Sequence, residues 1–142
     1  MDCKDLMVGD WVRFKENYPQ KELQGKIAKV KGVRGRIDVR TQDGEYYESE
    51  HPDWLEPIPL TEEILVKNGF IFNKGYAVLQ VSEDNYLDFY KHEHRLRKVW
   101  EGIDEWNNHA KVRDVTFVCQ CYYVHEFQHA LRLCGVEKSI IL

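Results

Sequence analysis

Three residues near the end of the chain have the types and spacing of a catalytic zinc site. Segment 125–129 reads His-Glu-Phe-Gln-His, with His125 and His129 one helical turn apart and a carboxylate at Glu126. In zinc hydrolases, two such histidines bind the metal, and the glutamate activates a metal-bound water as the general base. One alternative is therefore a zinc-dependent hydrolase with His125 and His129 as metal ligands and Glu126 as the catalytic residue.

The surroundings of this motif favour a non-catalytic interpretation. A catalytic zinc needs a third protein ligand, and no histidine follows His129. Glu137 lies beyond the expected helix end, and Arg132 places a fixed positive charge on the same helix face. An upstream ligand, His92 or His94, remains open. We expect no catalytic residue, no metal and no cofactor, with the histidines covering a polar helix face.

The cysteines favour free thiols over a metal site or a disulfide framework. Cys119 and Cys121, with the two downstream histidines, form an alternative structural zinc site, but their spacing is shorter than the usual C-x2–4-C turn. The first residues lack the apolar segment of a signal peptide, and the longest uncharged run, 115–124, is half the length that spans a bilayer. We therefore expect a cytoplasmic protein with reduced cysteines and no membrane association. The four cysteines are Cys3, Cys119, Cys121 and Cys134.

A basic segment provides a third alternative, nucleic-acid binding. Residues 21–40 carry a local excess of five positive charges, whereas residues 41–56 carry only acidic charged side chains and the whole chain has a net charge of −4. Neighbouring strands of a small barrel would bring the two segments together, so most of the charge is expected to cancel. Any nucleic-acid binding should be weak and sensitive to salt. The candidate contacts are Lys26, Lys29, Lys31, Arg34 and Arg36.

Residues 1–58 are expected to form a small β unit, which carries the basic segment. In segment 6–14, Trp11 and Arg13 alternate with Val12 and Phe14, which predicts a half-buried strand. Further short strands are separated by turn signals such as Asp43-Gly44, a spacing typical of small barrels. We expect an SH3-like β-barrel here, followed by a proline-containing linker at 57–60.

Residues 59–142 predict a second, α+β domain. Thr61 is a suitable N-cap for a short helix ending at Gly69. Strands are expected over 76–81, 86–91, 95–101 and 111–119, with a polar loop at 102–109. Val115, Phe117 and Cys119 should share one face of the last strand. An amphipathic helix over 122–134 then packs its apolar face on the sheet.

Composition is that of a globular protein: of 142 residues, 43% are hydrophobic, 31% charged and 13% aromatic. Segments 6–12, 56–61 and 65–70, and the Val-His-x-x-Gln helix within 123–131, resemble a group of short bacterial proteins of unknown function associated with mobile elements. That resemblance implies an SH3-like N-terminal part and a cytoplasmic location, and the group is not known for peptidase activity. We therefore expect an α+β protein that acts as a non-catalytic binding or protein-interaction module, with another protein as its partner.

Overall fold

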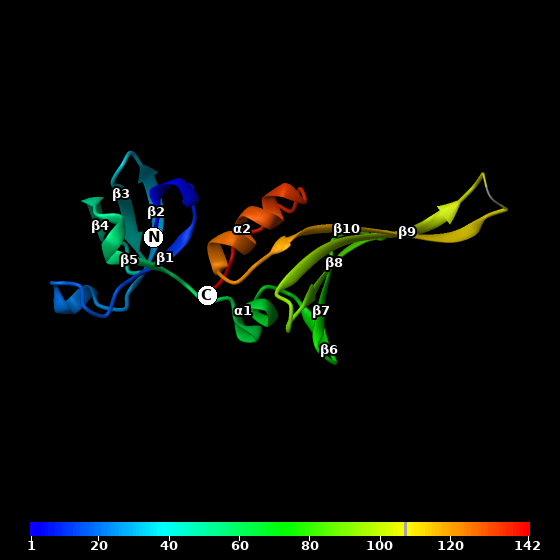
Figure 1. The fold of residues 1–142 in the computed structure, drawn as a ribbon, viewed down its shortest axis with the longest axis horizontal. Coiled ribbons are helices and arrows are strands. Elements are labelled where there is room, and N and C mark those ends of the chain that lie inside the picture. The colour runs from blue at the N-terminus through cyan, green and yellow to red at the C-terminus, as the bar shows by residue number, and fades with distance from the viewer. Residues whose placement is uncertain (107) are drawn as a thin grey trace. The chain divides into compact units, whose positions relative to one another are not determined.

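The computed structural model describes residues 1–106 and 108–142, apart from the side chain of Ser49. It is an α+β protein with two antiparallel five-stranded sheets and two α-helices (Figure 1). The chain divides into two compact units, Met1–Pro59 with Tyr123–His125, and Leu60–Tyr122 with Glu126–Leu142. Within the described residues, no helix is long and apolar enough to cross a membrane.

The first unit contains one sheet with the strand order β4-β3-β2-β1-β5. Val12 and Phe14 are buried while Trp11 and Arg13 are half-buried, so the predicted alternation in β1 is confirmed. Between residues 1 and 59 the described strands form an open sheet, and the expected closed barrel is not confirmed. The strands are β1 (Trp11–Phe14), β2 (Ile27–Val33), β3 (Ile37–Thr41), β4 (Tyr46–Glu50) and β5 (Leu55–Pro57), with 3-10 helices η1 (Cys3–Asp5), η2 (Lys21–Leu23) and η3 (Pro52–Trp54).

The expected linker begins one residue later than the sequence suggests. Pro57 is the last residue of β5 and lies opposite Val12. Because β5 is an edge strand, the missing N–H of proline removes no hydrogen bond that the sheet needs. The predicted helix cap is confirmed, since the Thr61 hydroxyl accepts a hydrogen bond from the Ile64 N–H at 3.3 Å.

The second unit contains an up-and-down sheet in which sequence neighbours pair, in the order β10-β9-β8-β7-β6. Phe89 lies opposite both Ala77 and Leu96, so these buried side chains share one face. Helix packing continues this core, with the Phe70 and Phe127 rings 5.7 Å apart. The elements are α1 (Glu62–Lys67), β6 (Ile71–Asn73), β7 (Tyr76–Gln80), β8 (Asn85–Tyr90), β9 (Arg95–Asp104), β10 (Ala110–Gln120) and α2 (Val124–Leu133).

The β9–β10 hairpin differs from the prediction in two ways. β9 continues to Asp104, so residues 102–104 are strand rather than loop, and residue 107 of the expected loop lies outside the described residues. A register shift between Phe117 and Cys119 places Cys119 opposite Leu96, whose side chain is buried on the core face. The prediction that Cys119 shares a face with Phe117 is therefore wrong, because a bulge reverses the alternation of a strand.

The last residues form a packed tail. The buried side chain of Asn68 donates to the Ile141 carbonyl and accepts from the Ile141 N–H, at 2.7 and 2.9 Å. Ile140 is buried beside this contact. Residues 139–142 form no strand and end the chain as this tail.

Candidate interaction surface

The histidine motif lies at the start of α2, and the polar helix face that carries it is buried at some positions and exposed at others, such as Arg132. His125 is 6% exposed, and Gln128 is also buried, whereas His129 is half-buried. Pro59 pairs with Tyr123, and the Val124 N–H donates to the Ile58 carbonyl at 2.9 Å, so segment 58–59 lies beside the start of the helix. The spacing of polar residues along the helix predicts a polar face. It does not predict that residues 58 and 59, far away in the sequence, pair with the start of the helix.

The glutamate of the motif has a structural contact. Glu126 Oε2 accepts a hydrogen bond from the Tyr122 N–H at 2.7 Å, at the N-terminus of α2, where a carboxylate is favoured by the helix dipole. Among residues 1–106 and 108–142, no group of three or more His, Cys, Asp and Glu side chains is arranged to hold a metal ion. The zinc alternative at His125, His129 and Glu126 thus has no third ligand within the described residues.

The cysteine pair lies at the end of β10. The Sγ atoms of Cys119 and Cys121 are 3.4 Å apart, and both residues are free thiols, as are Cys3 and Cys134. Burial, followed by the neighbouring Cys119 thiol, raises the pKa of the Cys121 thiol well above its ordinary value. Because the thiolate is the nucleophile and the metal ligand, Cys121 is a poor group for either role at neutral pH.

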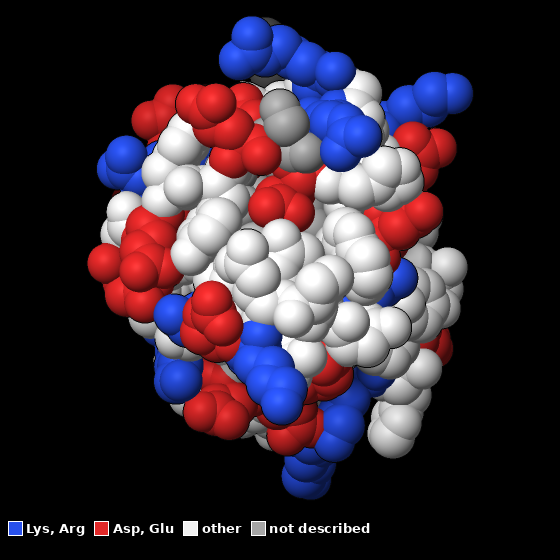
Figure 2. Space-filling view, turned by 90° about the vertical axis from the view of Figure 1, so that its left-hand side faces the viewer, with Lys and Arg blue, Asp and Glu red and all other residues white. Residues whose placement is uncertain are grey.

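The basic segment, residues 21–40, runs from η2 through β2 into β3, and two of its candidate contacts have acidic partners. Lys26 pairs with Asp43 at 2.9 Å, and Arg34 pairs with Asp38 at 3.5 Å. On the face drawn in Figure 2, groups of basic and groups of acidic side chains surround a broad uncharged area. Of the other candidates, Lys29 Nζ lies 5.0 Å from the centre of the Trp11 ring, and Lys31 and Arg36 are exposed.

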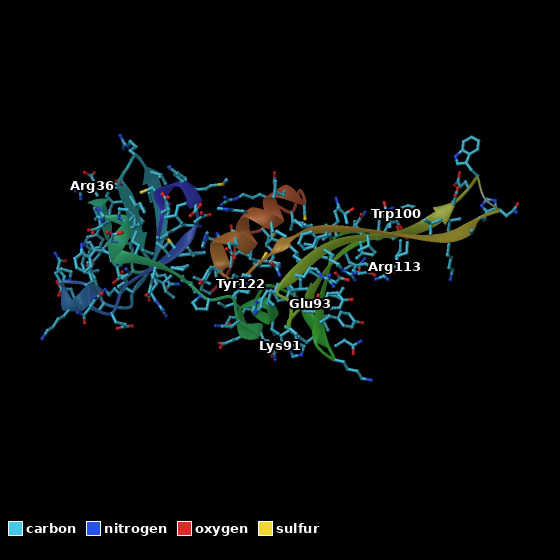
Figure 3. The ribbon with its side chains drawn as sticks, viewed as in Figure 1. Arg36, Lys91, Glu93, Trp100, Arg113 and Tyr122 are labelled. Atoms are coloured by element: carbon cyan, nitrogen blue, oxygen red, sulfur yellow. The ribbon has the colours of Figure 1, made fainter. Side chains whose placement is uncertain are left out.

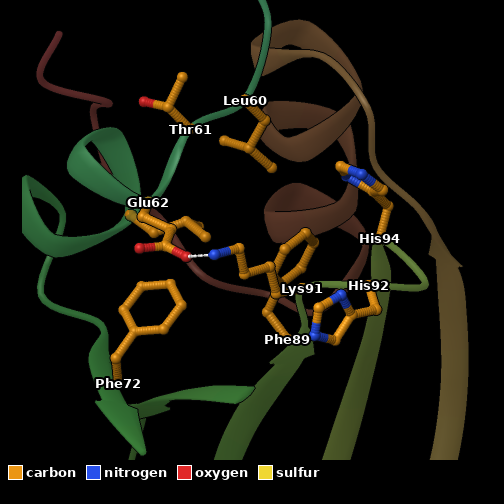
Figure 4. Close-up of a pocket in the computed structure, with 9 residues that line it drawn as sticks. Leu60, Thr61, Glu62, Phe72, Phe89, Lys91, His92 and His94 are labelled. Atoms are coloured by element: carbon orange, nitrogen blue, oxygen red, sulfur yellow. Dashed lines mark ion pairs between the residues drawn. The ribbon is translucent and has the colours of Figure 1, made fainter. Parts of the chain in front are cut away.

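A pocket of about 480 Å³ opens in the second unit (Figure 4). Lys91 and Glu62 form an ion pair across it, and the ring of His94 stacks on Tyr122 with centroids 4.6 Å apart. The pocket therefore combines a neutralised polar rim with an apolar floor, and it has no unbalanced Lys or Glu charge for an ionic ligand. The lining residues are Leu60, Thr61, Glu62, Leu65, Phe72, Phe89, Lys91, His92 and His94.

The longest strand edge without a neighbouring strand, within the described residues, is that of β10. This strand is 11 residues long and pairs with β9 on one side, and within the described residues no strand pairs with its other side. β9 and β10 extend past the remaining strands of their sheet (Figure 1), and we call residues 95–120 the arm. None of the residues of β10 is fully buried, although the strand is rich in β-branched and aromatic side chains.

Large apolar side chains of the arm are exposed on both of its faces. Phe117 is 55% exposed and Val115 is 38% exposed. Figure 3 shows Trp100 and Arg113 on opposite sides of the hairpin, as their register requires. Gly102 makes room for Trp100, because a Cβ at Gly102 would lie 2.1 Å from the indole. Ile103 and Trp106 are also exposed, so large apolar side chains reach the surface along much of the described part of the arm.

Part of this surface was visible in the sequence and part was not. The uncharged run from 115 belongs to the predicted strand 111–119, but that pattern alone does not predict that Val115 and Phe117 are exposed. The signal for an exposed edge lies in the charges of Lys111, Arg113 and Asp114, which point to both faces and so argue against burial of either face.

No family model, curated protein or solved structure matches the chain.

Proposed function

We propose that this protein is a non-catalytic protein-interaction module that adds a strand from its partner to the free edge of β10. The observation that carries the proposal is the 11-residue edge with exposed apolar side chains. In such strand addition, main-chain hydrogen bonds supply affinity, and alternate side chains supply specificity.

The pattern of protection along β10 supports a binding edge. Sheet proteins guard exposed edges with charges, prolines or short strands. β10 has charges at Lys111, Arg113 and Asp114, near its first half, but residues 115–120 carry no charge and no proline. The second half of the edge therefore lacks the charges and prolines that prevent strand pairing. Phe117 is a large apolar side chain in this half and is well exposed.

The first unit belongs to the same proposal as a separate small module. We propose that residues 1–58 are related to SH3-like barrels. The pairing of β1 with both β2 and β5, and the 3-10 helix η3 directly before β5, support this relation. The proposed cytoplasmic location follows from the same resemblance.

Site-specific photo-crosslinking in cells that express the chain tests the function. A benzophenone side chain replaces Phe117 in the arm, and in a matched control it replaces Tyr46, an exposed aromatic residue of the other sheet. We expect a discrete adduct band from position 117 and none from position 46. No adduct from position 117, or equal adducts from both, would show that the arm is not a specific binding surface.

The other candidate functions gain no comparable support. Residues 1–106 and 108–142 offer His125, His129 and Glu126 no third zinc ligand. Lys26 and Arg34 of the basic segment already pair with acidic side chains. The interaction module is therefore the single function we propose.

A further inference from the structure

We infer that the partner of β10 is a second copy of this chain, with the two β10 strands pairing antiparallel across a two-fold axis at Val115. This inference rests on the proposed function, because it names the partner of the same edge.

Symmetry restricts the possible registers. Residues directly opposite in a sheet point to the same face, and side chains in one strand alternate between faces. For two copies of one strand, opposite residues must therefore be an even number of positions apart, and the axis must pass through a residue. Within the regular part of β10, this leaves one register for each choice of central residue.

The charges of β10 exclude the registers nearer the arm tip. An axis at Arg113 or at Asp114 places that residue directly against its own copy, and like charges directly opposite are destabilising. An axis at Val112 places Lys111 against Arg113, again two positive charges. These exclusions move the axis toward the second half of the strand.

The bulge limits the registers on the other side. Pairing with β9 is regular up to Phe117 and shifts before Cys119. An axis at Val115 leaves a regular ladder over 113–117, whereas an axis at Thr116 leaves only 115–117. Val115 is therefore the central residue that gives the longest regular ladder without opposing like charges.

The resulting neighbours are complementary on both faces. On one face, Val115 packs on Val115 of the second copy, and the aliphatic stem of Arg113 packs against the Phe117 ring. On the other face, Asp114 lies opposite Thr116, whose hydroxyl donates to the carboxylate. The axis repeats each contact, so one register covers two exposed phenylalanine rings and two exposed valines.

Arg113 has its polar partners within its own chain. Its Nε lies 3.5 Å from the Glu101 carboxylate, and its Nη2 donates to the Tyr86 hydroxyl at 3.3 Å. These partners on β9 and β8 draw the guanidinium away from the free edge, on the sheet face that Phe117 shares by register, and leave the aliphatic stem of Arg113 at that edge. The positive charge is thus compensated within one chain before a second copy arrives.

The mass of the purified chain in solution gives the first test. Light scattering should report twice the 16.9 kDa mass of the chain. Val115→Arg should raise the dimer dissociation constant about a hundredfold, because it sets two positive charges directly opposite each other. Val66→Arg, at an exposed valine of α1, is the matched control and should leave the dimer unchanged. Circular dichroism checks that both variants are folded.

Cysteine cross-linking tests the register without disturbing the fold. Under mild oxidation with oxidised glutathione, Val115→Cys should form a covalent dimer above the level of the wild-type chain. Thr116→Cys alone should not, because opposite residues fall within disulfide reach and residues displaced by two positions do not. A mixture of Thr116→Cys with Asp114→Cys should form the mixed dimer.

The outcomes separate the inference from the proposed function. One outcome is a chain that is monomeric at every concentration but gives a photo-adduct with a different protein from position 117. This result would rule out a second copy as the partner and would still support the proposed interaction module. A monomer with no adduct overturns both. A dimer that cross-links at position 116 but not 115, or that survives Val115→Arg, overturns the register proposed here.

Discussion

The two sheets have the same number of strands and the same antiparallel pairing, yet they use their apolar residues differently. In β1 of the first sheet every second side chain is buried, and Val12 and Phe14 belong to one continuous core. In β10 of the second sheet no residue is fully buried, although β10 has 11 residues and β1 has only 4. The apolar side chains of β1 stabilise the core of their own unit. Those of β10 contribute little to a core.

This difference shows where the chain carries surface that its own folding does not require. Apolar side chains contribute to stability in proportion to the area they remove from water. Val115 and Phe117 leave much of that area exposed, so their contribution is available for association. The comparison predicts that substitutions of buried residues in the first sheet change folding, whereas substitutions of Val115 and Phe117 change association.

The largest expected effect contrasts two phenylalanines. Phe14→Ala should lower the free energy of unfolding of the first unit by about 3–5 kcal/mol, because the ring is fully buried against Tyr18. Phe117→Ala should change the unfolding free energy of the dilute chain by no more than about 0.5 kcal/mol. Urea titration measures both. Equal losses would mean that the arm is part of a folding core.

A second contrast lies within the C-terminal sheet. Arg97 donates two hydrogen bonds to Asp88, at 2.9 and 2.6 Å, and Asp88 is 2% exposed. Arg97→Ala should cost about 3 kcal/mol, because it leaves a buried carboxylate without its charge partner. Lys67→Ala, which removes the exposed pair with Glu63, is the control and should cost at most about 0.5 kcal/mol. A small loss for Arg97→Ala would show that water replaces the guanidinium.

The pH dependence of stability sharpens the description of the first sheet. Burial, followed by the hydrogen bond to Glu50, raises the pKa of Tyr18 from 10.0 to about 12. A raised pKa in the folded state means that this stability is present below pH 10 and is lost as the pH rises toward 12. The loss is on the order of 2 kcal/mol.

Urea titrations at pH 8 and pH 11 compare the wild-type chain with Tyr18→Phe. The variant lacks the ionisable hydroxyl, so the wild-type chain should lose more stability than Tyr18→Phe between the two conditions. Parallel losses in the two proteins would show that Tyr18 titrates normally in the folded chain.

The smallest effect concerns the thiols. Burial raises the pKa of Cys121, so its thiol should react slowly with Ellman's reagent in the native state. Cys121→Ser should then leave the number of fast-reacting thiols unchanged, whereas Cys3→Ser should reduce it, because Cys3 is only partly covered. Fast reaction at Cys121 would indicate that the end of β10 opens readily.

Local features of the fold were predictable from the sequence. The alternation around Trp11–Phe14 defined β1, and the Thr61 hydroxyl defined the start of α1. The C-terminal helix was placed over 122–134 and spans Val124–Leu133. These features depend on neighbours within one strand or one turn, which is the range over which periodicity and capping act.

Features that depend on distant residues were not predictable. The helix with buried His125 begins directly after a pairing of Pro59 with Tyr123, and no local pattern encodes this pairing. β9 continues through Gly102, a residue type that ordinarily weakens strands, because the indole of Trp100 occupies the space beside it. The free edge of β10 was missed for a related reason, since a strand pattern does not reveal how many neighbours the strand has.

The pairing of β1 with β5 has a consequence for the order in which the chain folds. The second sheet assembles from hairpins between sequence neighbours, whereas the first sheet must bring Val12 against Pro57, at opposite ends of its unit. Closing that long loop costs entropy before any contact repays it, and non-local pairing slows folding. During synthesis, the N-terminal unit therefore waits for its last strand, while each later strand can pair with its predecessor as soon as it emerges.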